Sequence, residues 1–317
     1  MTEYLLDQWD GQRRDQVVEP TVITIGTFDG IHRGHREVIS KICSRARAVG
    51  KKSLLVTFRP HPLSIISTGE APELLTSYDE KKEILRECGI DYVVFLPFNN
   101  DLANYDPREF VKDFLIDRFG LSELIIGYDH RFGKGGAGDM HLLKTLGKEM
   151  GFSVEVVPPL IKGGRPISSS AVRGYLSSGD VKSASENLGR LYSFVGEVVV
   201  GDKRGRKLGF PTANIKVVNE QGEVKLIPSE GIYAVIAQVG RTQYSGALHI
   251  GPRPTFLDPN KVIELYIIDF NADIYGKKVK VECVEYLRDI ASFESTRDLI
   301  SQMNNDVERV REILGKR

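Results

Sequence analysis

The periodicity of the apolar residues changes once along this chain of 317 residues, near residue 185. Up to about residue 157, short β-branched or apolar runs alternate with segments of helical period, which is typical of a parallel sheet flanked by helices. The predicted strands are 22–25, 53–57, 92–95, 123–126 and 153–157. A helix with one buried stripe is predicted after the first strand from Val38, Ile39, Ile42, Ala46 and Val49. We therefore expect an α/β, Rossmann-like domain over residues 1–185.

The second part of the chain is rich in β-forming segments that glycine and proline separate. The predicted strands are 194–200, 231–239, 243–249, 262–268 and 279–286. Short strands at such spacing favour a closed or nearly closed antiparallel β-barrel. A terminal helix is predicted from apolar residues that share one face, Leu299, Ile300, Met303, Val307, Val310 and Leu314. We expect a second domain over residues 186–317, with a fold different from the first.

The chain carries 43 basic and 43 acidic side chains, so its formal net charge is zero. It offers no general attraction to nucleic acid or to an anionic membrane, and phosphate chemistry must come from local sites. No apolar run is long enough to span a bilayer. Cys43, Cys88 and Cys283 show neither metal-ligand spacing nor a disulfide framework. We expect a cytoplasmic protein without a nucleic-acid or membrane partner, and a weak homo-oligomer stays open.

The first predicted strand runs directly into the sequence GTFDGIHRGH at residues 26–35, where the helix begins. In an open α/β sheet, ligands bind at the carboxyl ends of strands, where a helix N-terminus offers unpaired N–H groups to phosphate. His32 and His35 would project toward one place, and protonated or hydrogen-bonding imidazoles can neutralise charge during nucleotidyl transfer. The alternatives are a pair that only caps the helix, or half of a metal site. No third ligand cluster in this segment supports zinc.

Three further segments of the first domain are candidates for ligand binding. The sequence ISSSAVR at residues 167–173 places hydroxyls at a predicted helix start with Arg173 one turn in, which suits phosphate or simply caps the helix. The loops FRPHP at 58–62 and GYDHRFG at 127–133 follow the second and fourth predicted strands, at the ends where a ligand is expected. Alone, either loop would be interpreted as a surface turn.

The sequence GDKRGRKLGFPTAN at residues 201–214 is the most diagnostic stretch of the second domain. Its basic, glycine-rich loop could close over polyphosphate or could be a solvated hairpin. Thr212 and Asn214 offer two oxygen ligands on one face of an extended strand, which suits magnesium beside ATP phosphates. Glu264 lies in an otherwise apolar predicted strand and is either the polar face of that strand or a base beside a reacting hydroxyl.

The first two motifs, GTFDGIHRGH and ISSSAVR, resemble those of the nucleotidylyltransferase superfamily, in particular the N-terminal domain of the bacterial bifunctional riboflavin kinase/FAD synthetase family. The resemblance implies that His32 and His35 bind ATP phosphates and assist attack on the α-phosphate, with pyrophosphate leaving. It assigns nucleotide binding to Gly26, Phe28, Asp29, Gly34, Ser168, Ser169 and Arg173. It assigns flavin binding to His61, Pro62, Asp129 and Arg131. His130 stands where the family commonly has phenylalanine.

The string LGFPTAN at residues 208–214 is similar to the riboflavin kinase signature, and the resemblance covers nearly the whole chain. It implies nucleotide binding by Gly205, Gly209, Pro211 and Thr212, and magnesium binding by Thr212 and Asn214. It further implies a catalytic role for Glu264 and flavin contacts for Arg288 and Phe293. Two positions depart from the family: Tyr266 replaces a common histidine, and Ile290 replaces the acid of an Arg-Asp-Glu motif.

We therefore expect an enzyme of flavin-cofactor synthesis whose ligands are ATP, riboflavin, FMN and FAD. Riboflavin and ATP would give FMN and ADP, and FMN and ATP would then give FAD and pyrophosphate, both steps with Mg²⁺. Two alternatives stay open. One domain has lost its activity, for which the departures at His130, Tyr266 and Ile290 are the support, or the β-rich part is an oligonucleotide-binding module. Such a module should carry a basic stripe interleaved with aromatic residues, whereas the basic residues gather at 203–207.

Overall fold

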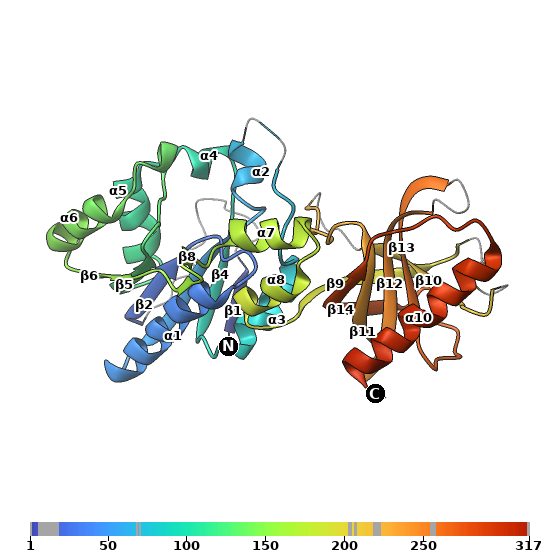
Figure 1. The fold of residues 1–317 in the computed structure, drawn as a ribbon. Coiled ribbons are helices and arrows are strands. Elements are labelled where there is room, and N and C mark those ends of the chain that lie inside the picture. Colours follow the sequence, from blue (N-terminus) through green and yellow to red (C-terminus); the bar gives the residue numbers. More distant parts are fainter. Residues whose placement is uncertain are drawn as a thin grey trace. The chain divides into compact units, whose positions relative to one another are not determined.

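The computed structural model describes residues 2–5, 19–67, 69, 71–201, 205, 208–217, 223–253 and 258–315. The chain forms two compact units, Met1–Ser168 and Ser169–Arg317 (Figure 1). The domain boundary at residue 185 stays a prediction, because a compact unit is not by itself a unit of activity. No helix within the described ranges is both long and apolar enough to cross a bilayer.

A parallel sheet forms the core of the first unit, in the order β1-β4-β3-β2-β5-β6. Its strands are β1 (Thr2–Leu5), β2 (Thr21–Ile25), β3 (Lys52–Arg59), β4 (Tyr92–Pro97), β5 (Leu121–Gly127) and β6 (Ser153–Val157). The five predicted strands are confirmed as β2 to β6, and β1 is an addition at the edge. The chain runs from β2 outward to β4 and then returns to the other side of β2 as β5. Ligands of such sheets bind at this switch point, at the carboxyl ends of β2 and β5.

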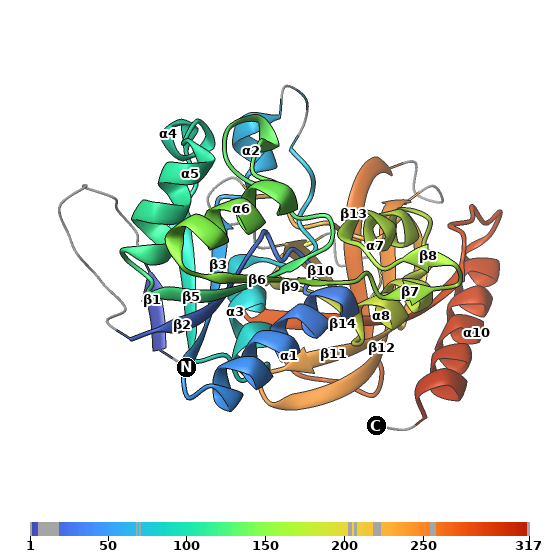
Figure 2. The same cartoon turned by 90° about the vertical axis from the view of Figure 1, so that its left-hand side faces the viewer.

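Helices cover both faces of this sheet, as in other doubly wound folds. One face carries α1 (Arg33–Ala48) and α3 (Tyr78–Glu87), and the predicted helix is thereby confirmed. The other face carries α5 (Pro107–Phe110), the π-helical segment Val111–Ile116 and α6 (Met140–Met150), and Figure 2 shows α1 and α6 separated by the strands. The remaining elements are short: α2 (Leu63–Ile66), α4 (Asn100–Ala103), the 3₁₀ turn Lys134–Gly136, and the hairpin of β7 (Ile161–Lys162) and β8 (Arg165–Pro166).

The second unit contains a closed antiparallel barrel in the order β10-β13-β12-β11-β14-β9, which confirms the predicted barrel. Its strands are β9 (Tyr192–Val199), β10 (Thr212–Val217), β11 (Gly231–Val239), β12 (Thr242–Arg253), β13 (Asp258–Ile267) and β14 (Lys278–Arg288). The extended segment expected at residues 212–214 is the start of β10. Closure pairs every strand on both sides and leaves no open edge.

Helices cover part of the barrel. The helices α7 (Ser169–Ser177) and α8 (Val181–Leu188) pack together, and α8 lies against β9 and β14. The predicted terminal helix is confirmed as α10 (Thr296–Leu314), which lies across the barrel in Figure 1. Its Val307 and Val310 join a buried cluster with Phe210 and Ala234. The face of the barrel under α10 is therefore its outer face.

Candidate active sites

The loop between β2 and α1 lies at the switch point of the first sheet. Phe28 and Ile31 have φ of 46° and 37°. Left-handed backbone at such residues costs about 1–3 kcal/mol each and persists only where the surroundings hold it, as happens at ligand sites. Both side chains are buried, with 4% and 0% exposed, and the Gly26 N–H donates to the carbonyl of Val56 at 3.0 Å. Core packing thus fixes the shape of this loop.

His32 and His35 form a stacked pair at the end of the loop. Their ring centroids lie 3.7 Å apart at an interplanar angle of 15°, and the His35 backbone N–H donates to His32 Nδ1 at 3.2 Å. His32 therefore caps α1. A Cβ at Gly34 would lie 3.2 Å from the His32 ring, so glycine lets the two rings stack. Capping occupies only Nδ1 of His32, and it is compatible with a phosphate role for the pair.

The charge state of His35 follows from its surroundings. Burial lowers the pKa of His35 well below 6.5, and the neighbouring His32 and the Lys81 ammonium lower it further. His35 Nδ1 is buried and has no hydrogen-bond partner among the described residues. His35 is therefore neutral near neutral pH and can serve a phosphate through a hydrogen bond. Of the two modes that the sequence left open, the structure favours hydrogen bonding over a fixed positive charge.

Asp29 is 1% exposed and holds the same loop in place. Its carboxylate accepts the backbone N–H groups of Leu75 and Thr76, both at 3.1 Å, and the Thr76 hydroxyl at 3.3 Å. The Gly30 N–H donates to Thr76 Oγ1 at 3.1 Å. Asp29 thus fastens the loop to the segment before α3, and its predicted contact with the nucleotide stays a prediction.

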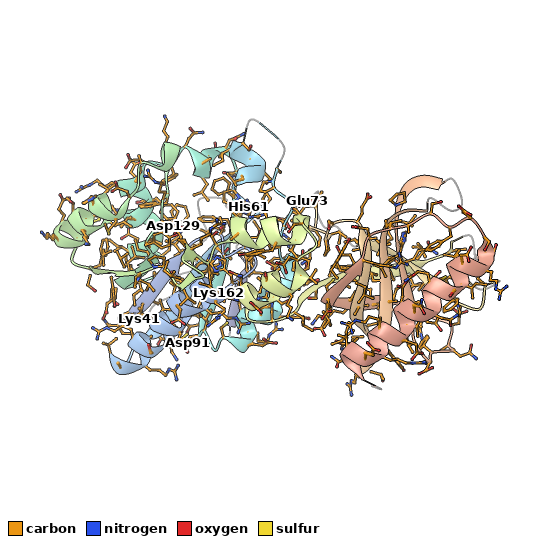
Figure 3. All side chains as sticks on the ribbon, in the orientation of Figure 1. Lys41, His61, Glu73, Asp91, Asp129 and Lys162 are labelled. Carbon is orange, nitrogen blue, oxygen red and sulfur yellow. The ribbon has the colours of Figure 1, made fainter. Side chains whose placement is uncertain are left out.

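The loops after β3 and β5 lie at this same end of the sheet. Figure 3 shows His61 and Asp129 there, whereas Asp91, which precedes β4, lies at the opposite end. His61 is 8% exposed, and its Nδ1 accepts the Leu63 N–H at 3.2 Å beside Pro62, the N-cap of α2. Asp129 and Arg131 are exposed. The loops therefore combine a fixed imidazole with charged groups open to a ligand.

Exposed apolar side chains accompany these two loops. Leu63 is 45% exposed, Ile66 53% and Tyr128 44%. Because β3 and β5 flank β2, all three lie around the end of the strand that carries the histidine pair. A planar apolar ring could cover them. The sequence analysis did not single out these residues, since an isolated Leu or Tyr in a loop carries no pattern.

Ser168, Ser169 and Arg173 lie around the predicted helix start, and α7 does begin at Ser169. Ser168 belongs to the first unit, in which the preceding carbonyl of Ile167 lies beside Gly34, 3.5 Å from the position of a Cβ there. The strand end, the histidine pair and Ser168 thus meet in one unit. Ser169 and Arg173 belong to the second unit, and their contact with the nucleotide stays a prediction.

In the barrel, strand register brings the predicted kinase residues together. Asn214 of β10 lies directly opposite Glu264 of β13, and Thr212 lies opposite Tyr266. Residues directly opposite in an antiparallel pair share one face, with Cβ atoms about 4.5–5.5 Å apart. Tyr266 packs edge-on against Phe210 at 5.3 Å in the cluster under α10. The metal-ligand candidates and the base candidate therefore form two adjacent rows on the outer face.

The glycines of the preceding loop allow it to approach these rows. A Cβ at Gly201 would overlap the Asn214 amide, and one at Gly205 would overlap the Phe210 carbonyl and lie 3.1 Å from the Thr212 hydroxyl. Gly209 has φ of 87°, which favours glycine. The residues at 202–204 and 206–207, which carry the basic side chains, lie outside the described residues. The described part of the loop still shows that its backbone lies against the two oxygen donors.

A cavity of about 190 Å³ opens beside Thr212. It is lined by Pro211, Thr212 and Ala213 of the signature, by Leu265 and Ile267 of β13, and by the loop from Phe270 to Tyr275. The sequence analysis selected no ligand residue in this loop, whose sequence NADIYG at residues 271–276 connects two predicted strands.

Arg288 is held by the terminal helix. Its Nε and Nη2 donate to the two carboxylate oxygens of Asp306 at 2.9 and 2.7 Å, and Gln302 donates to the same carboxylate at 2.9 Å. Asp306 is 8% exposed. The guanidinium lies 6.0 Å from the centroid of the Phe293 ring. The two predicted flavin residues are thus neighbours, and a flavin contact for either stays a prediction.

Comparison with known proteins identifies the family. A model described as FAD synthetase matches residues 14–171, and one described as riboflavin kinase matches residues 188–314. The bifunctional riboflavin kinase/FMN adenylyltransferase of Escherichia coli (strain K12) is 35% identical over 298 residues, 94% of each chain. That of Bacillus subtilis (strain 168) is 32% identical over 292 residues, 90% of each chain. This chain belongs to the bifunctional riboflavin kinase/FMN adenylyltransferase family.

The resemblance found in the sequence is thereby confirmed. The chain is an enzyme that phosphorylates riboflavin to FMN and adenylylates FMN to FAD, with ATP as co-substrate of both steps. The riboflavin kinase match covers the barrel and therefore argues against an oligonucleotide-binding module there. Among solved structures, the "Macrolide-efflux Protein from Streptococcus pneumoniae" aligns with a TM-score of 0.87 and 27% identity, over 98% of this chain and 99% of that chain. A solved protein therefore has the same fold.

One further residue of the adenylyltransferase unit escaped the sequence analysis. Lys81 of α3 is 8% exposed, and its ammonium donates to the carbonyl of Thr27 at 2.9 Å. It therefore places a positive charge directly beneath the loop that carries the histidine pair. A lysine on an amphipathic helix is usually a solvated side chain, so the pattern alone gave no reason to select it.

Proposed function

We propose that adenylyl transfer takes place at His32 and His35, and that riboflavin phosphorylation takes place on the barrel face that carries Thr212, Asn214 and Glu264. The observation that carries the second assignment is the register pair Asn214 and Glu264. It puts a hard oxygen donor beside a carboxylate on adjacent strands. The stacked histidines at the switch point carry the first assignment.

In the adenylyltransferase step, a phosphate oxygen of FMN attacks the α-phosphorus of ATP, and the bond to the bridging oxygen of pyrophosphate breaks. Negative charge grows on the non-bridging oxygens of the α-phosphate. A neutral His35 and its partner His32 can donate hydrogen bonds to these oxygens at the start of α1, where helix N–H groups add to the positive potential. The exposed Leu63, Ile66 and Tyr128 would receive the flavin ring, with His61, Pro62, Asp129 and Arg131 at its polar edge.

In the kinase step, the primary hydroxyl of the ribityl chain attacks the γ-phosphorus of ATP, and ADP leaves. Glu264 accepts the hydroxyl proton as the new P–O bond forms. The loop with Gly205, Gly209 and Pro211 lies along the ATP phosphates. The cavity beside Thr212 takes the nucleoside end of ATP, since its volume suits part of a nucleotide rather than a whole one.

Magnesium is the metal that we propose for both steps. The Thr212 hydroxyl and the Asn214 amide are hard oxygen donors on one strand face, and the Gly201 and Gly205 backbone lies close to both. No group of three or more His, Cys, Asp or Glu side chains within the described ranges could hold a metal alone. This fits a cation whose remaining ligands are phosphate oxygens. Bound there, it would neutralise charge on the transferring phosphoryl group.

Product analysis of the purified chain tests these assignments. With riboflavin, ATP and Mg²⁺, the parent should yield FMN and FAD, His32→Ala should stop at FMN, and Glu264→Ala should make FAD only from supplied FMN. A Glu264→Ala variant that still phosphorylates riboflavin would remove the base from the proposal. A parent that makes only one product would instead show that one half has lost its activity.

Other properties remain proposals. We propose a domain boundary at residue 185, a cytoplasmic location, and no nucleic-acid partner. A weak homo-oligomer is compatible with the chain, and light scattering over a range of concentrations would test it.

A further inference from the structure

We propose that His249 is a positioning residue of the riboflavin kinase step and orients the carboxylate of Glu264 through a hydrogen bond. The inference rests on the proposed role of Glu264 as base. His249 lies on β12, directly opposite Glu264 of β13, and Glu264 in turn lies directly opposite Asn214 of β10. The three residues thus form one row across three strands, with Glu264 at its centre.

The row lies on the outer face of the barrel, where a substrate can reach it. The neighbouring row contains Tyr266 and Ala247, both of which pack against the cluster under α10. His249 and Glu264 are partly exposed, whereas Leu248, Ile250 and Leu265, which flank them along the strands, are 0% exposed. Because these flanking side chains are fixed in the barrel interior, His249 and Glu264 must both point to the opposite face.

Of the two residues that lie directly opposite His249, Glu264 is the polar one. On the other side, His249 lies opposite Ile232 of β11, which is apolar. Directly opposite Cβ atoms lie about 4.5–5.5 Å apart, a separation that an imidazole and a glutamate side chain can bridge. The imidazole N–H donates and a carboxylate oxygen accepts. His249 then sets the orientation of the Glu264 carboxylate relative to the ribityl hydroxyl.

Orientation matters here because the carboxylate of glutamate turns about three side-chain bonds. A base must lie about 2.6–3.2 Å from the hydroxyl whose proton it accepts. A misplacement of about 1 Å can cost on the order of 100-fold in rate. A hydrogen bond from a neighbouring strand limits the carboxylate to one arrangement. His249 should therefore act on turnover rather than on the affinity for either substrate.

The experiment uses the full chain with four substitutions at one position. His249→Ala and His249→Leu remove the donor, and His249→Leu retains bulk. His249→Asn and His249→Gln restore an amide N–H donor, each near the position of one of the two imidazole nitrogens. We expect kcat of riboflavin phosphorylation to fall about 10–100-fold in the Ala and Leu variants, with KM for riboflavin and MgATP within about two-fold. The Asn or the Gln variant should regain most of that loss.

FAD formation from supplied FMN is the control within the same chain, and it should be unchanged in all four variants. Equal kcat in the Leu, Asn and Gln variants, or a change confined to KM, would overturn the proposal. Glu264→Gln separates this inference from the proposed function. If Glu264→Gln retains kinase activity, the base assignment fails. If it lowers kcat to a residual rate, His249→Ala added to Glu264→Gln should cause no further loss from that rate, and an independent loss would show that His249 acts without Glu264.

Discussion

Replacing His130 by phenylalanine should stabilise the adenylyltransferase unit, and more so at acid pH. His130 follows β5, and its ring stacks on Phe132 with centroids 5.7 Å apart and an interplanar angle of 23°. Its Nε2 is buried without a hydrogen-bond partner among the described residues. Burial lowers the pKa of His130 from 6.5 to about 4. A phenyl ring keeps the stacking and leaves no buried nitrogen.

The magnitude follows from the difference in proton binding. In the unfolded chain, His130 is protonated below about pH 6.5, whereas in the folded protein its imidazole stays neutral down to about pH 4. Below pH 6.5 the unfolded state therefore binds more protons, and the free energy of unfolding falls as the pH falls. Between pH 7.5 and pH 5 this linkage amounts to about 2 kcal/mol. His130→Phe removes it, so the stability difference between variant and parent should widen by about that amount.

Urea unfolding followed by pulsed deuterium labelling and mass spectrometry can measure this for one unit at a time. Peptides from β2 and β5 report on the adenylyltransferase unit, and peptides from β11 report on the barrel as control. His141→Gln is the matched variant, because it removes an exposed histidine from the same unit. A stability difference between His130→Phe and the parent that is the same at both pH values would refute the reasoning. An equal widening in His141→Gln would refute the site-specific cause.

Three further changes test other contacts. Gly205→Ala should raise the KM for MgATP in riboflavin phosphorylation about ten-fold, because the added Cβ would overlap a backbone carbonyl, and FAD formation from FMN should not change. Lys81→Met should raise the pKa of His35 part of the way toward 6.5, so the acid-side fall of FAD formation should move to higher pH, and an unmoved profile would contradict this. Asp306→Ala should destabilise the barrel unit by about 3 kcal/mol, since it leaves the Arg288 guanidinium without its buried partner, and urea unfolding of β11 peptides would detect it.

Most strands and the terminal helix could be predicted because their apolar residues recur with the period of a strand or of a helix. Strands β2 to β6 are short apolar runs between helical segments, and α10 repeats its apolar residues along one face. β1 escaped prediction, because four residues at a sheet edge carry too little pattern. The loops after β2, β3 and β5 were predictable as ligand loops, since parallel strands bring their carboxyl ends to one side.

The contacts that hold these loops could not be predicted. Asp29 stands within the motif, yet its carboxylate binds N–H groups 46 and 47 residues away along the chain. Lys81 reaches the loop from another helix. Such pairings depend on how helices dock on the sheet, and no local pattern encodes that. The motif therefore predicted where the chemistry lies and left open which residues keep its shape.

Strand register explains why only part of the barrel site could be predicted from the sequence. Asn214 was recognisable from its own strand and Glu264 from an apolar strand far along the chain, but nothing in either segment states that they lie opposite one another. Once the register is fixed, it also adds a residue that no motif contains, because whatever stands opposite Glu264 on the next strand must share its face. In this chain that residue is a histidine. A one-residue slip of β12 would turn its side chain to the barrel interior, so the register that closes the barrel also selects the side chain next to Glu264.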